Sequence, residues 1–197
     1  MRKELLQERE NRNMKSLKYI ILSVTLFLVC IFTFCAVNLN KTYKEGFIDN
    51  DLTIYTENKL SKYVGGDKAQ LFFPEYSEIQ NAENIRFQYC DNTKKSNFFH
   101  KFYSYFCLDV ILKDDEYQSF IENLEAPYED GSEILHFTVL KEEFENSVCK
   151  AILCNDKTKT VRYVLFYGDF DDYDAENGIV PIMSWNMNLN QEDGSLA

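Results

Sequence analysis

The sequence FYSYFCLDVIL, from Phe102 to Leu112, contains the most regular hydrophobic pattern in the chain. Successive side chains of an extended chain point to opposite faces, so alternate residues share a face. One face receives Phe102, Phe106, Leu108, Val110 and Leu112, interrupted by Ser104, and the other receives Tyr103, Tyr105, Cys107, Asp109 and Ile111. Aromatic and β-branched residues favour strands. The stretch therefore predicts a β-strand with an apolar core face and a second face that carries tyrosines.

Further strands are predicted on both sides of this one. Residues 85–90 alternate aromatic or aliphatic side chains with others, and a polar loop follows them, so a hairpin with residues 102–112 is expected. Four later apolar runs have the composition of strands, namely residues 134–140, 148–154, 160–167 and 179–185. The segment Asn155-Asp-Lys-Thr-Lys159 is rich in turn residues and is expected to join two of them.

Residues 115–124 predict an amphipathic helix. Asp115 stands at the N-cap, Gln118 follows at capping-box spacing, and Pro127 ends the helix. Its apolar stripe consists of Tyr117, Phe120, Ile121 and Leu124. Residues 52–63 fit either a short helix or an irregular lead-in. The predicted fold class is α+β: an antiparallel β-sheet with one main amphipathic helix packed on it, preceded by a single N-terminal transmembrane helix.

The transmembrane prediction rests on residues 19–39, which contain no charged side chain. A helix of this length covers about 30 Å, the thickness of the hydrocarbon core of a bilayer. A cleaved signal peptide and a lipoprotein signal at Cys30 or Cys35 are the alternatives. The apolar core exceeds the usual signal length, and bulky Val29 and Phe34 stand where a lipoprotein signal needs a small residue. An uncleaved signal-anchor in the lipid bilayer is therefore favoured.

Charge predicts the topology of the chain. Six lysines and arginines precede the span, which favours a cytoplasmic N-terminus and places the C-terminal domain outside the cytoplasm, in a single-pass protein of the cell membrane. The expected segments are a basic tail (residues 1–18), the span (19–39), a spacer (40–51), an extracytoplasmic α+β domain (52–185) and a flexible tail (186–197).

The region after the basic tail is strongly acidic. The first 18 residues carry a net charge of +3 out of a total of −11, which leaves −14 on the rest of the chain. Such a domain repels the phosphate backbone of nucleic acids, so no nucleic-acid partner is expected.

Four cysteines outside the span are candidates for disulfide bonds, namely Cys90, Cys107, Cys149 and Cys154. Cys149 and Cys154 lie in one predicted strand, about 16 Å apart, beyond the reach of a disulfide. A bond between Cys90 and Cys107 fits the predicted hairpin. Four buried thiols are the equally weighted alternative. The spacing is not CxxC, which argues against zinc binding and disulfide exchange.

An acidic loop offers oxygen ligands of the kind that calcium prefers, from Asp169, Asp171, Asp172, Asp174 and Glu176. The loop departs from the EF-hand pattern, because Asn177 occupies the glycine position counted from Asp172. A solvated acidic turn is therefore favoured over a metal site.

Catalytic and cofactor motifs are missing from the sequence. It contains no nucleophile elbow, Walker loop, dinucleotide-binding glycine motif or His-Glu-x-x-His, so no cofactor is expected. The two histidines are His100, in a predicted loop, and His136, in the apolar run 134–140, where a structural role is the usual one.

The tyrosine-bearing face of the central strand is the remaining candidate. Tyr103 and Tyr105 would suit binding to a protein or a glycan if exposed, and would form a second core layer under residues 52–80 if covered. We favour the covered arrangement. The expected function is a non-enzymatic interaction module at the cell surface. The alternative is a membrane-tethered enzyme or signalling subunit that uses carboxylates of residues 169–176.

Overall fold

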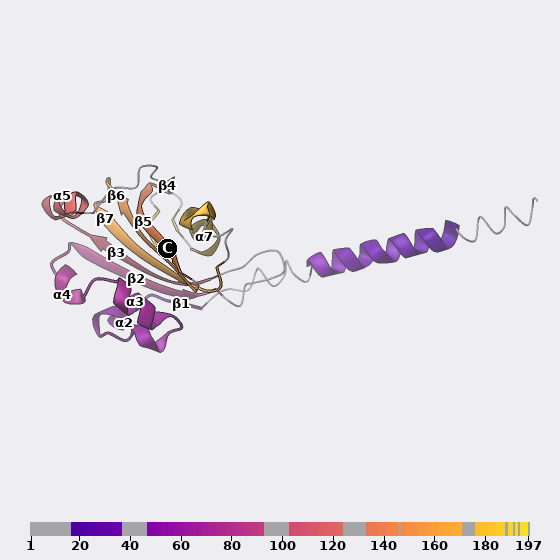
Figure 1. The fold of residues 1–197 in the computed structure, drawn as a ribbon, viewed down its shortest axis with the longest axis horizontal. Helices are drawn as coiled ribbons and strands as arrows, with labels where there is room; N and C mark the ends of the chain where they lie inside the picture. Colours follow the sequence, from indigo (N-terminus) through magenta and orange to yellow (C-terminus); the bar gives the residue numbers. More distant parts are fainter. Residues whose placement is uncertain are drawn as a thin grey trace, which may run out of the picture. The chain divides into compact units, whose positions relative to one another are not determined.

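A curled antiparallel sheet forms the centre of the domain (Figure 1). The computed structural model describes residues 17–36, 47–92, 103–123, 133–145, 147–170, 176–187, 189–190, 192 and 194–196. Within these residues the sheet has seven strands in the order β1-β2-β3-β7-β6-β5-β4. Their bounds are β1 Phe47–Asp49, β2 Asn84–Asp91, β3 Ser104–Ile111, β4 Glu133–Ile134, β5 Phe137–Glu145, β6 Val148–Asn155 and β7 Thr160–Tyr167. The predicted α+β class is confirmed at this level.

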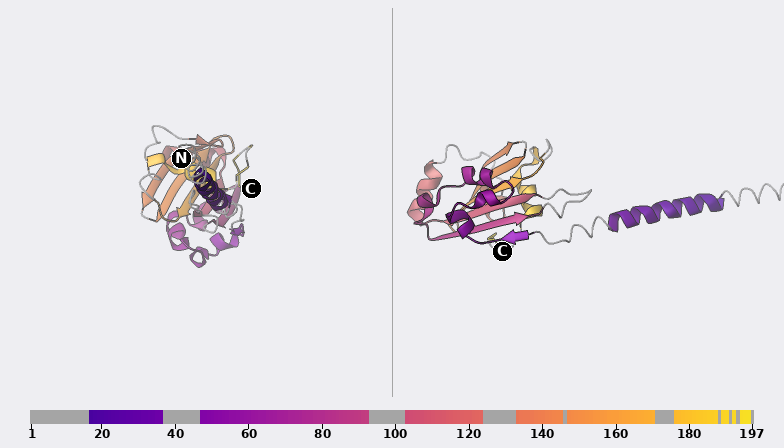
Figure 2. Two further views of the ribbon diagram at one scale, coloured as in Figure 1. Left: turned by 90° about the vertical axis from the view of Figure 1, so that its right-hand side faces the viewer. Right: turned by 90° about the horizontal axis from the view of Figure 1, so that it is seen from below.

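Helices cover both faces of the sheet. Their bounds are α2 Thr53–Thr56, the 3-10 helix η1 Leu60–Lys62, α3 Gly66–Phe72, α4 Tyr76–Ile79, α5 Asp114–Asn123 and α7 Ile179–Asn186. The group α2 to α4 lies against one face, and α7 lies against the other (Figures 1 and 2). The face that bears α2 to α4 also bears α5, whose Tyr117 packs on Cys154 and Val161. The expectation of one main helix is therefore not supported.

Local pattern predicted four strands correctly. The segments 85–90 and 102–112 correspond to β2 and β3, which pair antiparallel with Phe87 opposite Leu108. The segments 148–154 and 160–167 correspond to β6 and β7, joined by the predicted turn after Asn155. In that turn Oδ1 of Asn155 accepts hydrogen bonds from the backbone N–H groups of Lys157 and Thr158, at 3.0 and 3.2 Å.

The apolar run 134–140 is not one strand. Leu135 and His136 adopt positive φ angles of 46° and 70° and form a tight turn that separates β4 from β5. Positive φ is uncommon for residues with a side chain, so alternation of apolar residues gave no sign of this turn. The prediction that His136 lies within a strand is wrong, and its side chain is exposed.

The run 179–185 is also not a strand, because it forms α7. A short run that is apolar at nearly every position does not reveal its period, and burial on the sheet decides between helix and strand. In α7, Ile179, Ile182 and Met183 occur at helical spacing and are buried. Pro181 is tolerated because it lies in the first turn, where its missing N–H has no helical partner.

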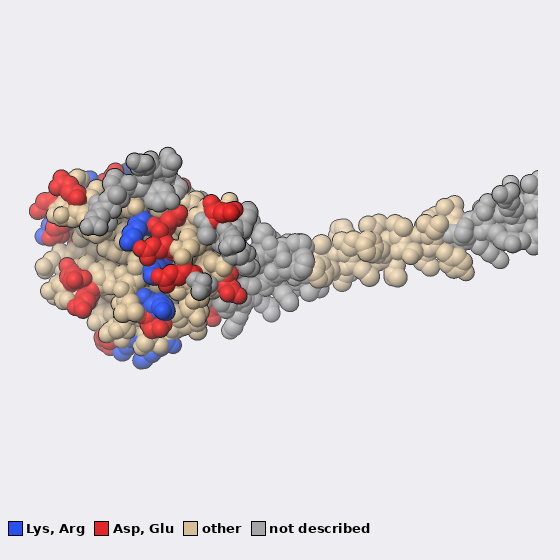
Figure 3. Space-filling model, viewed as in Figure 1, with Lys and Arg blue, Asp and Glu red and all other residues tan. Residues whose placement is uncertain are grey.

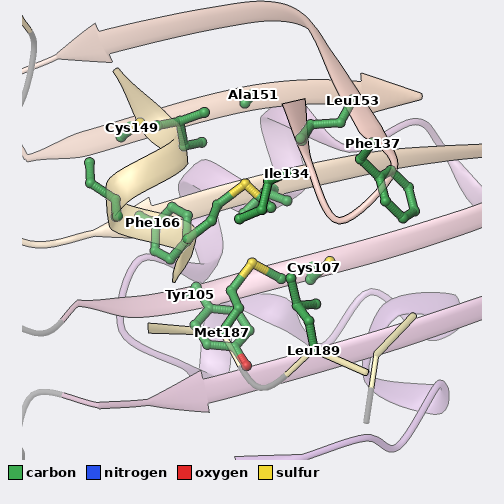
Figure 4. Packing of buried hydrophobic residues seen from close by; sticks show 14 of the residues in the cluster. Tyr105, Cys107, Ile134, Phe137, Cys149, Ala151, Leu153, Phe166, Met187 and Leu189 are labelled. Atoms are coloured by element: carbon green, nitrogen blue, oxygen red, sulfur yellow. The ribbon is translucent and has the colours of Figure 1, made fainter. Parts of the chain in front are cut away.

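Two hydrophobic clusters flank the sheet. On the α7 side, Tyr105, Cys107 and Phe166 meet Met187 and Leu189, which follow α7 (Figure 4). The described part of segment 186–197, expected to be a flexible tail, thus contributes to the core. The expected spacer 40–51 likewise includes β1, which is part of the sheet. On the other side, Phe106, Leu108 and Val110 pack under residues 52–80.

The N-terminal helix is a separate unit of the structure. It spans Leu17–Ala36, has a mean hydropathy of 2.5, and has none of that length buried in the protein. An apolar helix is therefore present where the sequence predicted one, shifted by two residues at its start, and residues 37–39 of the predicted span lie outside the described residues. It is long and apolar enough to cross a bilayer, a property that signal sequences share.

Candidate functional site: an acidic groove between α4 and α5

A groove with a volume of about 710 Å³ separates α4 from α5. Its floor is the sheet, where Val110 of β3 lies beside Val161 and Tyr163 of β7. Apolar walls come from Ile79, Leu112 and Phe120, and three carboxylates line it, namely Glu78, Asp115 and Glu116. Acidic side chains gather over α5 and over α4, with uncharged surface between them (Figure 3). The groove therefore combines an apolar floor with negatively charged sides.

The α4 side is held by a short network of hydrogen bonds. The hydroxyl of Tyr55 donates to the carbonyl of Pro74 at 2.5 Å, which fixes the approach to α4. A capping box then links Glu75 and Glu78, in which the backbone N–H of Glu75 donates to Oε2 of Glu78 at 3.0 Å. This bond holds the Glu78 carboxylate at the edge of the groove.

The α5 side is anchored by Tyr117. Its ring is fully buried, and its hydroxyl donates to Oδ1 of Asp156 at 2.6 Å, which ties the helix to the β6–β7 turn. Burial, followed by this hydrogen bond, raises the pKa of Tyr117 far above its ordinary value. Three acidic residues open α5, and carboxylates near a helix N-terminus are stabilised by the helix dipole. This placement explains why Asp115 and Glu116 are accommodated at the edge of the groove.

The carboxylates of the α5 side differ in their partners. Asp114 lies 3.7 Å from Nζ of Lys159. Within the described part of the chain, neither Asp115 nor Glu116 has an ion-pair partner, and no described residue that lines the groove is basic. The negative charge on this side of the groove is consequently not neutralised by the groove itself.

Tyr163 gives the floor of the groove a hydroxyl group, and the other hydroxyl among the described lining residues belongs to Ser119 of α5. Its ring centroid lies 6.0 Å from that of Phe72 and 6.4 Å from that of Phe73, so neighbouring rings hold it in place. Burial, and then the negative charge of Glu78, raise the pKa of Tyr163 to about 12. The hydroxyl therefore stays protonated at neutral pH and can donate a hydrogen bond to a bound group.

Sequence reasoning did not identify this groove. The sequence pattern assigns Asp115 only to a helix cap, and it assigns no role to Glu78. The capping pattern and the acidic cluster were visible in the sequence. Nothing in the sequence indicated that α4 and α5 pack on the same face of the sheet.

The tyrosine face predicted from the central strand is not exposed. Tyr103 and Tyr105 are 4 % and 0 % exposed. The Tyr105 hydroxyl donates to Oε1 of Gln88 at 2.5 Å, and the Tyr103 ring stacks on Phe170 at 4.3 Å. Both belong to the core on the α7 side, so these tyrosines are covered from that side and not by residues 52–80 as expected. Residues 52–80 pack instead on Phe106, Leu108 and Val110. These side chains point to the opposite face of the sheet from Tyr103 and Tyr105, because alternate residues of β3 point to opposite sides.

The four cysteines of the domain are buried thiols in the structure. Cys90 lies opposite Tyr105 and Cys107 opposite Gln88, so the two cysteines of the predicted hairpin are offset by two residues. Sγ of Cys90 donates to Asn92 at 3.2 Å. Burial raises the pKa of Cys107 and of Cys154, which disfavours the reactive thiolate.

The acidic-loop candidates are only partly described by the structure. Asp171, Asp172, Asp174 and His100 lie outside the described residues, whereas Asp169 and Glu176 are described. No three metal-ligating side chains gather anywhere in the described ranges.

A buried ion pair in the sheet was not predicted. Nε and Nη2 of Arg162 donate to the two carboxylate oxygens of Asp109, at 2.6 and 2.7 Å. Phe137 covers the guanidinium, with its ring centroid 4.0 Å away. Burial by itself would lower the pKa of Arg162, but the Asp109 carboxylate outweighs it and raises that pKa. The pair lies in the closed core on the α7 side, which indicates a structural role.

Comparison with protein-family models, curated proteins and solved structures finds no significant match for this chain.

Proposed function

We propose that this protein is a single-pass, membrane-anchored interaction module whose α+β domain, outside the cytoplasm, binds a partner in the groove between α4 and α5. The groove is the single observation that carries the proposal. It has the size of a binding site, an apolar floor, and a few polar groups at its edge. The apolar helix Leu17–Ala36, whose charged residue is Lys18 in its first turn, and the basic residues before it support the anchor and its orientation.

Binding is favoured over catalysis because of the side chains in the groove. Nucleophilic and general-base catalysis need a nucleophile within hydrogen-bond reach of a base, or titrating groups with pKa values near neutrality. The described lining has no histidine, cysteine or lysine, and Tyr163 titrates far above neutral pH. Carboxylates beside an apolar floor suit recognition of a ligand rather than its conversion.

The topology is tested by treating intact cells with protease and detecting the C-terminal domain. We expect digestion on intact cells. Protection that disappears on lysis would place the domain in a sealed compartment and refute the orientation.

The groove is tested by photo-crosslinking on intact cells. A photo-crosslinking amino acid with a short aliphatic diazirine side chain, too small to fill the groove, replaces Ser119, which lines the groove. A matched control replaces Glu122, which is exposed on the same helix outside the lining. We expect a discrete crosslinked product from position 119 that position 122 does not give. Equal products from both positions, or none from position 119, would refute the groove as the contact surface.

A further inference from the structure

We infer that the groove between α4 and α5 binds a basic peptide segment that carries an apolar side chain between lysines or arginines. This inference rests on the proposed function, because it names the chemistry of the partner for the same groove.

The charge of the groove selects a cationic partner. Glu78 lies on the α4 side, and Asp115 and Glu116 lie on the α5 side, with no described basic residue in the lining. The chain after residue 18 carries a net charge of −14, so the surrounding field has the same sign. Acidic or neutral partners gain no attraction from this field, whereas a basic partner is attracted and oriented by it.

The floor selects an apolar group. Ile79, Leu112 and Phe120 line the groove and are only half-buried, above Val110 and Val161, which are already buried in the sheet. An aliphatic or aromatic side chain that packs against these half-buried side chains removes further apolar surface from water. A purely polar cation leaves that surface wet. The hydroxyl of Tyr163 makes no hydrogen bond to any described residue and can donate to a backbone carbonyl of the ligand.

The two acidic sides select a chain rather than a single charge. They belong to separate helices, and the apolar floor lies between them. One peptide can contact the floor and both acidic sides if an apolar residue lies on the floor and its basic neighbours extend to the α4 side and the α5 side. The aliphatic stems of lysine and arginine then lie along Ile79 and Phe120 while the charged ends stay hydrated near the carboxylates.

The test measures peptide binding to the full chain in nanodiscs of zwitterionic phosphatidylcholine, which do not themselves attract basic peptides by charge. The ligand is a fluorescein-labelled synthetic peptide of alternating lysine and leucine, followed by fluorescence anisotropy. Two control peptides carry glutamate for lysine or serine for leucine. We expect saturable binding of the first peptide only, weakened by added salt because the charged groups are near the surface.

The deciding variant carries Glu78→Gln, Asp115→Asn and Glu116→Gln. Glutamine at position 78 can keep the capping box, so α4 is preserved. The matched control carries Asp67→Asn, Glu122→Gln and Glu133→Gln, which removes the same charge from exposed positions outside the groove. Loss of three exposed or half-exposed charge contacts is expected to weaken binding about tenfold in Kd, whereas the control variant changes Kd less than about twofold.

A second variant tests the floor without changing charge. Ser119→Trp fills the groove from an exposed position of α5, and Glu122→Trp places the same bulk outside the lining. We expect loss of peptide binding for the first and full binding for the second. Retained binding in Ser119→Trp, equal weakening by both charge variants, or equal binding of the serine control peptide would overturn the inference.

The crosslinking experiment on cells separates the inference from the proposed function. A specific crosslink at position 119, combined with peptide binding that ignores the groove carboxylates, leaves the interaction module intact and removes the basic peptide. Competition by spermidine as strong as that of the lysine–leucine peptide would assign the groove to small polyamines and also overturn the inference.

Discussion

Replacement of Asp109 by asparagine is expected to destabilise the domain strongly. The carboxylate accepts two hydrogen bonds from Arg162, at 2.6 and 2.7 Å, and both side chains are buried. Asparagine has nearly the same shape but offers one acceptor oxygen, and its amide group would face a guanidinium N–H. The guanidinium would then be a buried charge without a counter-ion. Breaking a buried pair in this way costs about 3–5 kcal/mol.

This cost is large compared with the whole stability of a domain, which is typically about 5–15 kcal/mol. The assay is urea unfolding of the detergent-solubilised chain, followed by far-UV circular dichroism. The matched control is Glu145→Gln, which removes one partner of a surface ion pair between β5 and β6, where Nζ of Lys150 lies 2.8 Å from the Glu145 carboxylate. An exposed pair contributes about 0.2–1 kcal/mol, so the control should unfold nearly as the natural chain does.

A double variant, Asp109→Leu with Arg162→Met, tests the origin of the cost. Replacing a buried ion pair by apolar residues of similar volume often leaves the free energy of unfolding unchanged. The replacement loses the attraction between the charges, but it also removes the cost of taking both charges out of water. We expect the double variant to lose much less stability than Asp109→Asn alone. A loss below about 1 kcal/mol for Asp109→Asn, or a double variant as unstable as the sum of its single changes, would refute the reasoning.

Three further predictions concern other parts of the fold. Gly66→Ala should cost about 1–3 kcal/mol in thermal unfolding, because a Cβ would lie 1.7 Å from the carbonyl oxygen of Leu60, whereas Asp67→Ala at the next, exposed position should cost little. Alkaline pH should destabilise the fold, because the hydrogen bond to Asp49 and burial raise the pKa of Tyr63 to about 12 from 10.0. Because native Tyr63 is neutral, its contribution to the free energy of unfolding is complete below pH 10.0 and is lost as the pH rises to about 12. Tyr63→Phe should make this loss of stability with pH shallower in unfolding measurements, and an unchanged pH profile would contradict the role of Tyr63. The four domain cysteines should resist alkylation in the native chain and react in urea without reductant, as read by mass spectrometry, and a cysteine that reacts only after reduction would indicate a disulfide.

The sequence by itself determined those elements whose pattern is local. The alternation in residues 102–112 is sufficient to predict β3, because a period of two residues is the pattern of an extended chain, although the structure buries both faces of this strand. The pair β6–β7 follows from two runs joined by a short polar segment, the pair β2–β3 follows from two consecutive strand-like runs, and the apolar length of Leu17–Ala36 predicts its helix.

Tertiary structure decided every feature that depends on what covers a surface. Apolar residues at nearly every position of 179–185 fit a buried strand as well as a buried helix, and packing on the sheet selected α7. The same packing buried Tyr103 and Tyr105 under α7. The groove formed because α4 and α5, distant in sequence, rest on one face of the same sheet, and local periodicity carries no information about such a meeting.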